Sequence, residues 1–244
     1  FSRNWLYDFI DIDLSTEEIC SQLTMAGLEV DGYENIDSKV TGKDSIIKLD
    51  LTPNRGDCFS VLGVARELAV INDLQLRLPK PAKVKHSFKD SIKVKVSPQG
   101  PSYFGRTLKN ISISSKTKPL IAERLRLSDQ KLIDPVVDIT NYILLELGQP
   151  LHAFDRDKLI GDISVRNAKD KEKITLLDGQ NLALDTNFLV IADDSGPIAF
   201  AGIMGGKDSS VTNTTRSIFL ESAFFKPSSI RGKARRFGFQ TDAS

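Results

Sequence analysis

From residue 163 onward the chain is a succession of short apolar segments separated by tight-turn signals, and this pattern constrains the fold most. The segments ISVRNA, ITLLDGQNLAL, FLVIADDSGPIAFAGIMGG and SIFLESAFF are rich in β-branched and other apolar residues. Asp178-Gly179 is a strong hairpin-turn dipeptide, and the string DDSGP marks a second turn. Strands joined by tight turns pair in antiparallel fashion, so the pattern predicts a mostly antiparallel sheet.

The first part of the chain mixes helix and strand signals. Ser15-Thr16-Glu17-Glu18 places a hydroxyl N-cap before the acidic residues of a first helical turn, and Gly27 is a natural C-terminal stop, so a helix is expected between them. Strands are expected on both sides of a polar loop at 37–45. The order strand, helix, strand, strand, helix predicts a small α+β unit.

A segment rich in Pro and Lys, residues 78–90, is expected to link two domains. Before this segment, Pro53 and Gly56 argue against a helix across 53–56, and Asp57 is expected to cap the helix that follows.

Two helices are expected early in the second domain. One is amphipathic and covers 119–132, and the other is apolar and ends at Gly148 and Pro150. The predicted fold class is therefore α+β, with a small N-terminal α+β domain at 1–85 and a larger, mostly antiparallel α+β domain at 86–244.

The net charge of +1 hides an asymmetry along the 244 residues. Residues 1–85 carry 10 Lys and Arg against 14 Asp and Glu, a net charge of −4. Residues 86–244 carry 23 against 18, a net charge of +5. The second part is therefore the better candidate to bind a polyanion, although such a charge is common and argues only weakly for nucleic acid.

Several classes of protein are excluded by the sequence. No apolar run approaches the ~20 residues that a transmembrane helix needs, and the acidic, aromatic N-terminal segment is not typical of a signal peptide. Cys20 and Cys58 lack the spacing of metal ligands. We therefore expect reduced thiols in a cytoplasmic protein that has no metal site.

The glycine-rich string GIMGGKD, residues 202–208, is not a nucleotide-binding P-loop. That motif needs a Gly, four residues and then Gly-Lys-Ser/Thr, but Ala201 stands at the first position and Asp208 at the last. The glycines instead predict a strand end at which the backbone closely approaches another group.

Glu221 lies in the predicted strand SIFLESAFF. Alternation places it on the same face as Phe219, Ala223 and Phe225. A carboxylate among aromatic rings needs a partner, because an unpaired buried charge is very costly. Two interpretations stay open at this point. Glu221 is either a structural carboxylate, bonded to backbone or arginine or simply exposed, or it accepts a hydrogen bond from a ligand hydroxyl.

Other polar groups are candidates for binding. His152 in the string QPLHAFD is either a core histidine or a site group. Thr140 and Asn141 in DITNY either bend a helix through local hydrogen bonds or face a ligand. The string RGKARR is either a phosphate-contacting segment or a solvated basic face; its cations are Arg231, Lys233, Arg235 and Arg236.

Six strings of this sequence are long or specific: NWLYDFIDIDLSTEEICSQLTMAGLEVDG, LDLTPNRGDCFSVLGVARELA, DPVVDITNYILLELGQPLHAFD, LLDGQ, LVIADDSGPIAFAGIMGG and FLESAFF. The first string begins at residue 4 and the last ends at residue 225, so the span that they mark covers nearly the whole chain. In this order they resemble the N-terminal half of the bacterial phenylalanyl-tRNA synthetase β subunit.

The chain departs from the pattern of that family in three places. The family usually carries an OB-type tRNA-binding domain between GLEVDG and LTPNRGD, where this chain has only a short segment around 37–45. The family often has Cys-Pro-Arg-Tyr where this chain has Gly100-Pro101-Ser102-Tyr103, and it continues beyond the final TDAS. The resemblance thus implies a fragment without the OB-type domain, the modules that dock the α subunit, and the aminoacylation site.

The resemblance implies that residues 86–244 form an editing domain that hydrolyses tyrosine wrongly esterified to tRNA(Phe). A pocket built for Phe discriminates poorly against a near-isostere that adds a hydroxyl, so a second site that requires the hydroxyl is needed. By motif, Glu221 and the backbone of Gly202 would read the tyrosine hydroxyl. His152 would lie near the ester, as a catalytic base or as a positioning group. The other pocket residues implied by the motifs are Thr140, Asn141, Thr241 and Ala243.

The resemblance also implies partners and cofactors. The partners are tRNA(Phe), contacted through the cations of RGKARR, and the α subunit of a full-length heterotetramer, with no membrane involved. No cofactor is expected in this fragment, and ATP and magnesium are expected for the full synthetase. The alternative function is a non-catalytic tRNA- or protein-binding module, and the intact set of Glu221, Gly202 and His152 favours hydrolysis over it.

Overall fold

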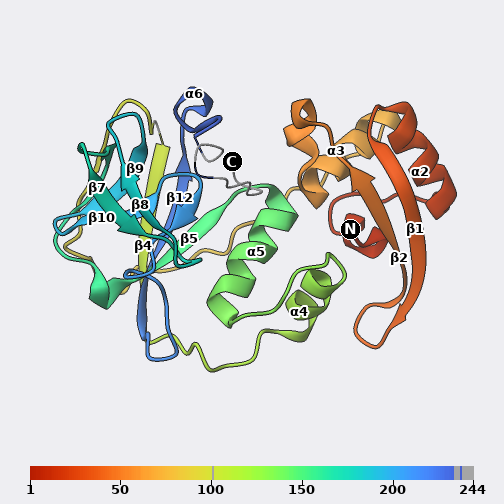
Figure 1. Ribbon diagram of the computed structural model, residues 1–244. Helices are drawn as coiled ribbons and strands as arrows, with labels where there is room; N and C mark the ends of the chain where they lie inside the picture. The colour runs from red at the N-terminus through yellow and green to blue at the C-terminus, as the bar shows by residue number, and fades with distance from the viewer. Residues whose placement is uncertain (101, 234–236, 238–244) are drawn as a thin grey trace. The chain divides into compact units, whose positions relative to one another are not determined.

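The chain forms two compact units in a computed structural model, which describes residues 1–100, 102–233 and 237 (Figure 1). Unit 1 comprises Phe1–Lys85 and Ser115–Gln149, and unit 2 comprises His86–Ser114 and Pro150–Ser244. Each unit combines helices with strands, so the fold is α+β, as predicted. Among the described residues, no helix is both long and apolar enough to cross a bilayer.

The division into units differs from the predicted domains in one segment. The boundary after Lys85 falls within the segment rich in Pro and Lys. However, Ser115–Gln149 packs with unit 1 rather than with the strands that flank it in sequence. This segment contains α4 (Pro119–Arg126) and α5 (Pro135–Leu147).

Trp5 lies at the contact between the two stretches of unit 1. Its side chain is fully buried and its ring stacks on that of Tyr142, with 5.0 Å between the ring centroids. The guanidinium of Arg124 lies 4.8 Å from the centroid of the Trp5 ring and pairs with Asp8 at 2.6 Å. An aromatic stack covered by a cation that is itself paired joins α4 and α5 to the N-terminal residues.

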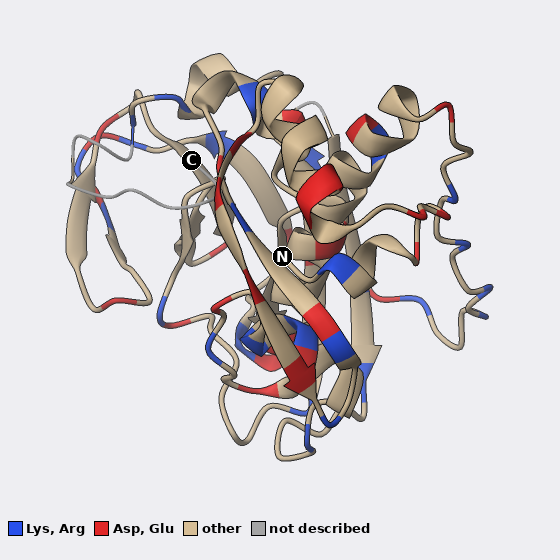
Figure 2. Cartoon of the chain, turned by 90° about the vertical axis from the view of Figure 1, so that its right-hand side faces the viewer, with Lys and Arg blue, Asp and Glu red and all other residues tan. Residues whose placement is uncertain are grey.

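The N-terminal stretch of unit 1 contains a long antiparallel hairpin (Figure 1). Acidic and basic residues are interspersed along its strands (Figure 2). Before the hairpin, Ser15 caps a helix, as the sequence predicted, and the side chain of Glu18 completes a capping box with it. The elements are α1 (Arg3–Leu6), α2 (Thr16–Met25), β1 (Glu29–Ser38) and β2 (Gly42–Asp50).

Two expectations for this stretch are wrong. The segment before α2 contains the short helix α1 rather than a strand, and its N-cap is Ser2, whose side chain accepts from the backbone of Trp5. The predicted loop at 37–45 shrinks to the residues between Ser38 and Gly42, because most of it pairs within the hairpin.

The connection to α3 (Val61–Ile71) also differs from its prediction. The 3-10 helix η1 (Pro53–Cys58) occupies a stretch where no helix was expected, and its backbone kinks at Arg55. Proline is tolerated at the first position of a helical turn, because the missing N–H has no intrahelical partner there. Ser60, not Asp57, caps α3, since its Oγ accepts a backbone N–H of the first turn at 3.0 Å. Asp57 instead pairs with Arg55 at 3.1 Å.

The described residues of unit 2 form three sheets, which the strand pairing defines. A five-stranded sheet has the order β11-β10-β9-β6-β3, a three-stranded sheet has the order β4-β12-β5, and β7 pairs with β8. Every pairing is antiparallel except that of β3 with β6, so the mostly antiparallel prediction is confirmed. The elements are β3 (Val94–Val96), β4 (Ser102–Lys109), β5 (Leu151–Asp155), η2 (Arg156–Lys158), β6 (Ile163–Asn167), β7 (Glu172–Thr175), β8 (Asn181–Leu184), β9 (Leu189–Asp193), β10 (Gly196–Phe200), β11 (Met204–Gly205), β12 (Ser217–Phe224) and α6 (Pro227–Ile230).

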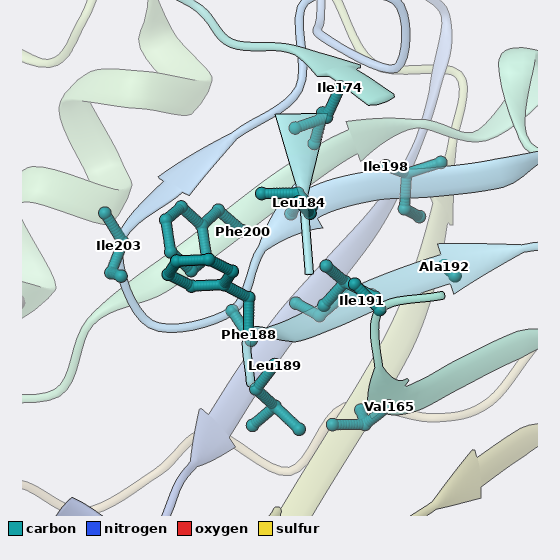
Figure 3. Packing of buried hydrophobic residues seen from close by; sticks show 14 of the residues in the cluster. Val165, Ile174, Leu184, Phe188, Leu189, Ile191, Ala192, Ile198, Phe200 and Ile203 are labelled. Carbon is teal, nitrogen blue, oxygen red and sulfur yellow. The ribbon is translucent and has the colours of Figure 1, made fainter. Parts of the chain in front are cut away.

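One apolar core fills unit 2 (Figure 3). Phe188 and Phe200 meet edge to face within it, with 5.3 Å between their ring centroids. Phe154 of β5 and Phe219 of β12 belong to the same core, so the three-stranded sheet turns one face inward. Burying a side chain of this size contributes about 1.5–3 kcal/mol. Polar groups on this inner face are consequently shielded from water.

Candidate functional site

Glu221 and His152 lie directly opposite each other on the inner face of the three-stranded sheet. The antiparallel register of β12 and β5 pairs Glu221 with His152 and Phe219 with Phe154. Side chains at directly opposite positions have Cβ atoms about 4.5–5.5 Å apart. The sheet therefore brings together two predicted site residues from distant parts of the sequence.

Glu221 is a buried carboxyl group held by a phenol. Its residue is 6% exposed, and the Tyr103 hydroxyl donates a hydrogen bond to its Oε2 at 2.8 Å. Burial raises the pKa of Glu221 to about 7, and the hydrogen bond from Tyr103 opposes this shift. Burial and the neighbouring Glu221 raise the pKa of Tyr103, so its hydroxyl stays protonated and donates. Glu221 is therefore not exposed, and no arginine in the described part of the chain forms an ion pair with it.

His152 is a half-buried residue of β5. Its ring meets the edge of Phe154 at a centroid distance of 4.5 Å. Its Nε2 is buried and has no hydrogen-bond partner among the described residues. Burial lowers the pKa of His152 to about 4, so the imidazole is neutral at pH 7. A buried nitrogen that has no hydrogen-bond partner costs about 1–3 kcal/mol of stability. Nε2 of His152 is therefore a candidate to form a hydrogen bond to a ligand.

The hairpin of β10 and β11 supplies glycines beside these groups. A Cβ at Gly205 would lie 2.4 Å from Cε1 of His152 and 2.5 Å from its Nε2. The close backbone approach that the string GIMGGKD predicted is therefore found at Gly205. Gly202 lies in the turn of the same hairpin with φ +67°, and a Cβ there would lie 3.2 Å from the ring of Phe225, just after β12.

The predicted site residues do not all lie in the same unit. Thr140 and Asn141 lie on α5 in unit 1, whereas His152, Glu221 and Gly202 lie in unit 2. Thr140 Oγ1 donates to the carbonyl of Val137 at 2.8 Å, which is the local helix hydrogen bond predicted as one alternative. Four further predicted residues lie outside the described part of the chain: Arg235, Arg236, Thr241 and Ala243.

The two described cations of the basic segment follow α6. Arg231 is exposed and Lys233 partly buried, and neither side chain has an ion pair within the described ranges 1–100, 102–233 and 237.

Tyr103 and Gly205 were missed as site residues. Tyr103 stands 118 positions before its partner Glu221, so only the pairing of β4 with β12 brings them together. Gly205 carried a signal, since consecutive glycines at a strand end indicate close backbone approach, but the sequence did not identify the group approached.

Comparison with known proteins agrees with the motifs of the sequence. Residues 99–244 match the B3/4 domain, and the chain belongs to this family. Over most of its length it is similar to phenylalanine–tRNA ligase β subunits. It is 52% identical over 203 residues to that of Idiomarina loihiensis, covering 82% of this chain and 26% of the relative. It is 48% identical over 219 residues to that of Acinetobacter baylyi, covering 89% and 27%. The resemblance inferred from the motifs is thereby confirmed.

The chain spans about a quarter of the length of these curated relatives. A crystal structure of an N-terminal fragment of the phenylalanyl-tRNA synthetase β subunit from Pyrococcus horikoshii is also similar. Its TM-score is 0.45 at 21% identity, and the match covers 94% of this chain and 68% of that fragment.

Proposed function

We propose that this chain is the part of a phenylalanine–tRNA ligase β subunit that hydrolyses tyrosine esterified to tRNA(Phe). The observation that carries the proposal is the environment of Glu221. It is a buried carboxyl group that a single phenol holds on one oxygen. It lies opposite a neutral histidine whose Nε2 is unpaired among the described residues.

The same environment supports selection of tyrosine over phenylalanine. Glu221 and the backbone of Gly202 bind the tyrosine hydroxyl, and a phenylalanyl ester leaves the carboxyl group without this partner. A buried polar group without a partner costs about 1–3 kcal/mol, which corresponds to roughly 5- to 150-fold in rate. The discrimination thus requires the extra hydroxyl instead of attempting to exclude it.

Hydrolysis needs a water that attacks the ester carbonyl while the ribose oxygen leaves. A general base works best when its pKa is near the operating pH. Burial lowers the pKa of His152 to about 4, so the imidazole is a weak base at neutral pH. We assign His152 a positioning role, in which Nε2 forms a hydrogen bond to the terminal adenosine or to the attacking water.

The wider assembly is part of the same proposal. Arg231 and Lys233 contact tRNA phosphates, and the α subunit of the ligase is the protein partner in the cytoplasm. The hydrolysis needs no cofactor, whereas the complete ligase uses ATP and magnesium for aminoacylation. The other proposed contacts to tRNA or to the substrate are those of Thr140, Asn141, Arg235, Arg236, Thr241 and Ala243.

The test is deacylation of Tyr-tRNA(Phe) and Phe-tRNA(Phe) by this chain and by Glu221→Ala. The wild-type chain releases tyrosine faster than phenylalanine, and Glu221→Ala slows tyrosine release roughly 10- to 100-fold because the hydroxyl loses its acceptor. Ser222→Ala is the matched control, since Ser222 is the next residue of β12 and faces the other side of the sheet. Tyrosine release by folded Glu221→Ala at the wild-type rate would refute the proposal.

A further inference from the structure

The carboxyl group of Glu221 is fixed by its surroundings on β4. Glu221 pairs directly with Gly105, and Ala223 pairs with Tyr103, so Tyr103 is the diagonal neighbour of Glu221 on the inner face. A Cβ at Gly105 would lie 2.1 Å from Cζ of Phe219, which shows that the Phe219 ring lies over Gly105. An apolar ring thus covers the position beside Glu221, and the polar group that reaches the carboxyl comes from Tyr103.

The hydrogen bond from Tyr103 involves one carboxyl oxygen. The hydroxyl donates to Oε2 at 2.8 Å, and no other described side chain donates to Glu221. A carboxylate has about four acceptor positions over its two oxygens, so Oε1 remains able to accept from a ligand. Because a carboxyl rotates about its last torsion with little preference, a fixed donor on one oxygen determines where the other oxygen points.

We propose that Tyr103 is a positioning residue for tyrosine selection, which holds one oxygen of Glu221 so that the other accepts the phenol hydroxyl of the substrate. The carboxyl group is shared between two phenols, one from the protein and one from the tyrosyl ester. Tyr103 acts through Glu221 and does not itself touch the reacting atoms. This inference rests on the proposed hydrolysis.

The variant that tests it is Tyr103→Phe, which keeps the ring and removes the hydroxyl. We expect kcat/KM for Tyr-tRNA(Phe) to fall about 10-fold, since the carboxyl group of Glu221 loses the hydrogen bond that orients its free oxygen. Slow hydrolysis of Phe-tRNA(Phe) stays within about twofold of wild type, because that substrate has no hydroxyl to place. Tyr33→Phe is the matched control, since Tyr33 also donates to a glutamate, Glu17, but on an exposed surface of unit 1.

A double-mutant cycle separates positioning from a merely structural role. In the Glu221→Ala background, Tyr103→Phe should change the tyrosyl-ester rate by less than about twofold, because the carboxyl group through which Tyr103 acts is absent. Equal loss in both backgrounds, or equal loss for both esters, overturns the inference and leaves the proposed function standing. Wild-type activity of Tyr103→Phe overturns it in the same way.

A measurement without substrate distinguishes failure of the inference from failure of the proposed function. Carbon-13 NMR of labelled glutamate side chains follows the titration of Glu221. Removal of the Tyr103 hydroxyl should raise the pKa of Glu221, because this hydrogen bond lowers it. An unchanged titration overturns the contact itself. If the pKa of Glu221 rises but the chain hydrolyses neither ester, the contact with Tyr103 is supported and the proposed function is refuted. The positioning role of Tyr103 is then refuted as well.

Discussion

At the scale of single residues, Glu221 and His152 titrate with opposite effects on stability. Burial raises the pKa of Glu221 from 4.5 to about 7, so the folded chain keeps a proton that the unfolded chain releases, and stability falls as pH rises through this range. Burial lowers the pKa of His152 from 6.5 to about 4. Below pH 6.5 the unfolded chain therefore binds the extra proton, and stability rises with pH. Where the two pH ranges overlap, the pH dependence of stability that comes from Glu221 therefore opposes that from His152.

Replacing Glu221 by Gln should leave only the pH dependence of stability that comes from His152. Relative to wild type, Glu221→Gln should gain stability between pH 5 and pH 7, by on the order of 1–3 kcal/mol, because Gln needs no proton when buried. Urea unfolding at pH 5, 6 and 7, followed by circular dichroism, measures the difference. Glu172→Gln is the control. Arg166 lowers the pKa of Glu172, so this variant should lose a similar amount at all three values. A difference for Glu221→Gln that does not change with pH would contradict the assigned burial.

The sequence could predict the face of Glu221 but not its partner. Alternation along β12 places Glu221 with Phe219, and the structure confirms that this face is buried. Tyr103 could not be assigned, because a hydrogen bond across 118 positions depends on which strands pair and in which register. His152 was identified as a candidate from its apolar surroundings, but its unpaired Nε2 is a property of the folded site.

At the scale of secondary-structure elements, the hairpin of β10 and β11 shapes the wall of the site. Gly205 pairs with Ala199. Because Gly205 has no side chain, the His152 ring lies against its backbone. The carbonyl of Gly205 also accepts from the backbone N–H of Leu177 at 3.1 Å, which holds this part of the strand in place. The backbone of the hairpin therefore cannot shift easily to make room for a larger residue at position 205.

Gly205→Ala should consequently displace the His152 ring. A Cβ would lie 2.4 Å from the imidazole, so we expect a stability loss of about 1–3 kcal/mol. Hydrolysis of the tyrosyl ester should fall at least about 10-fold, because a small misplacement of a positioning group is costly. Gly56→Ala is the control, since a Cβ there meets nothing within 4 Å. Normal hydrolysis by Gly205→Ala would show that the position of the His152 ring does not matter.

Elements with strong local signals were predictable, and short helical turns were not. The capping box of α2 and the left-handed Gly148 at the end of α5 are both found. By contrast, α1 and η1 contain four and six residues, which is too short for a hydrophobic period to identify them. Tertiary contacts and caps stabilise such turns, so local propensity alone gives the wrong state.

At the scale of the whole molecule, unit 1 is assembled from two stretches separated in sequence. Composition and the linker predicted one boundary, but the return of Ser115–Gln149 to unit 1 depends on contacts that no local pattern encodes. Arg124 makes three of these contacts. It pairs with Asp8, donates a hydrogen bond to the Tyr142 hydroxyl at 2.9 Å and covers the ring of Trp5. Docking of α4 and α5 should therefore be sensitive to this one side chain.

Arg124→Ala should destabilise unit 1 by roughly 2–4 kcal/mol. The variant loses a partly buried ion pair, a hydrogen bond and a cation–π contact, and it leaves a cavity beside Trp5. Trp5 is the only tryptophan in the sequence, so its fluorescence in urea reports unfolding of unit 1 alone. Arg126→Ala is the matched control on the same helix. Arg126 pairs with Glu123, but its side chain is 62% exposed, so the expected loss is below about 1 kcal/mol. If both variants unfold at the same urea concentration, Arg124 does not hold the two stretches of unit 1 together.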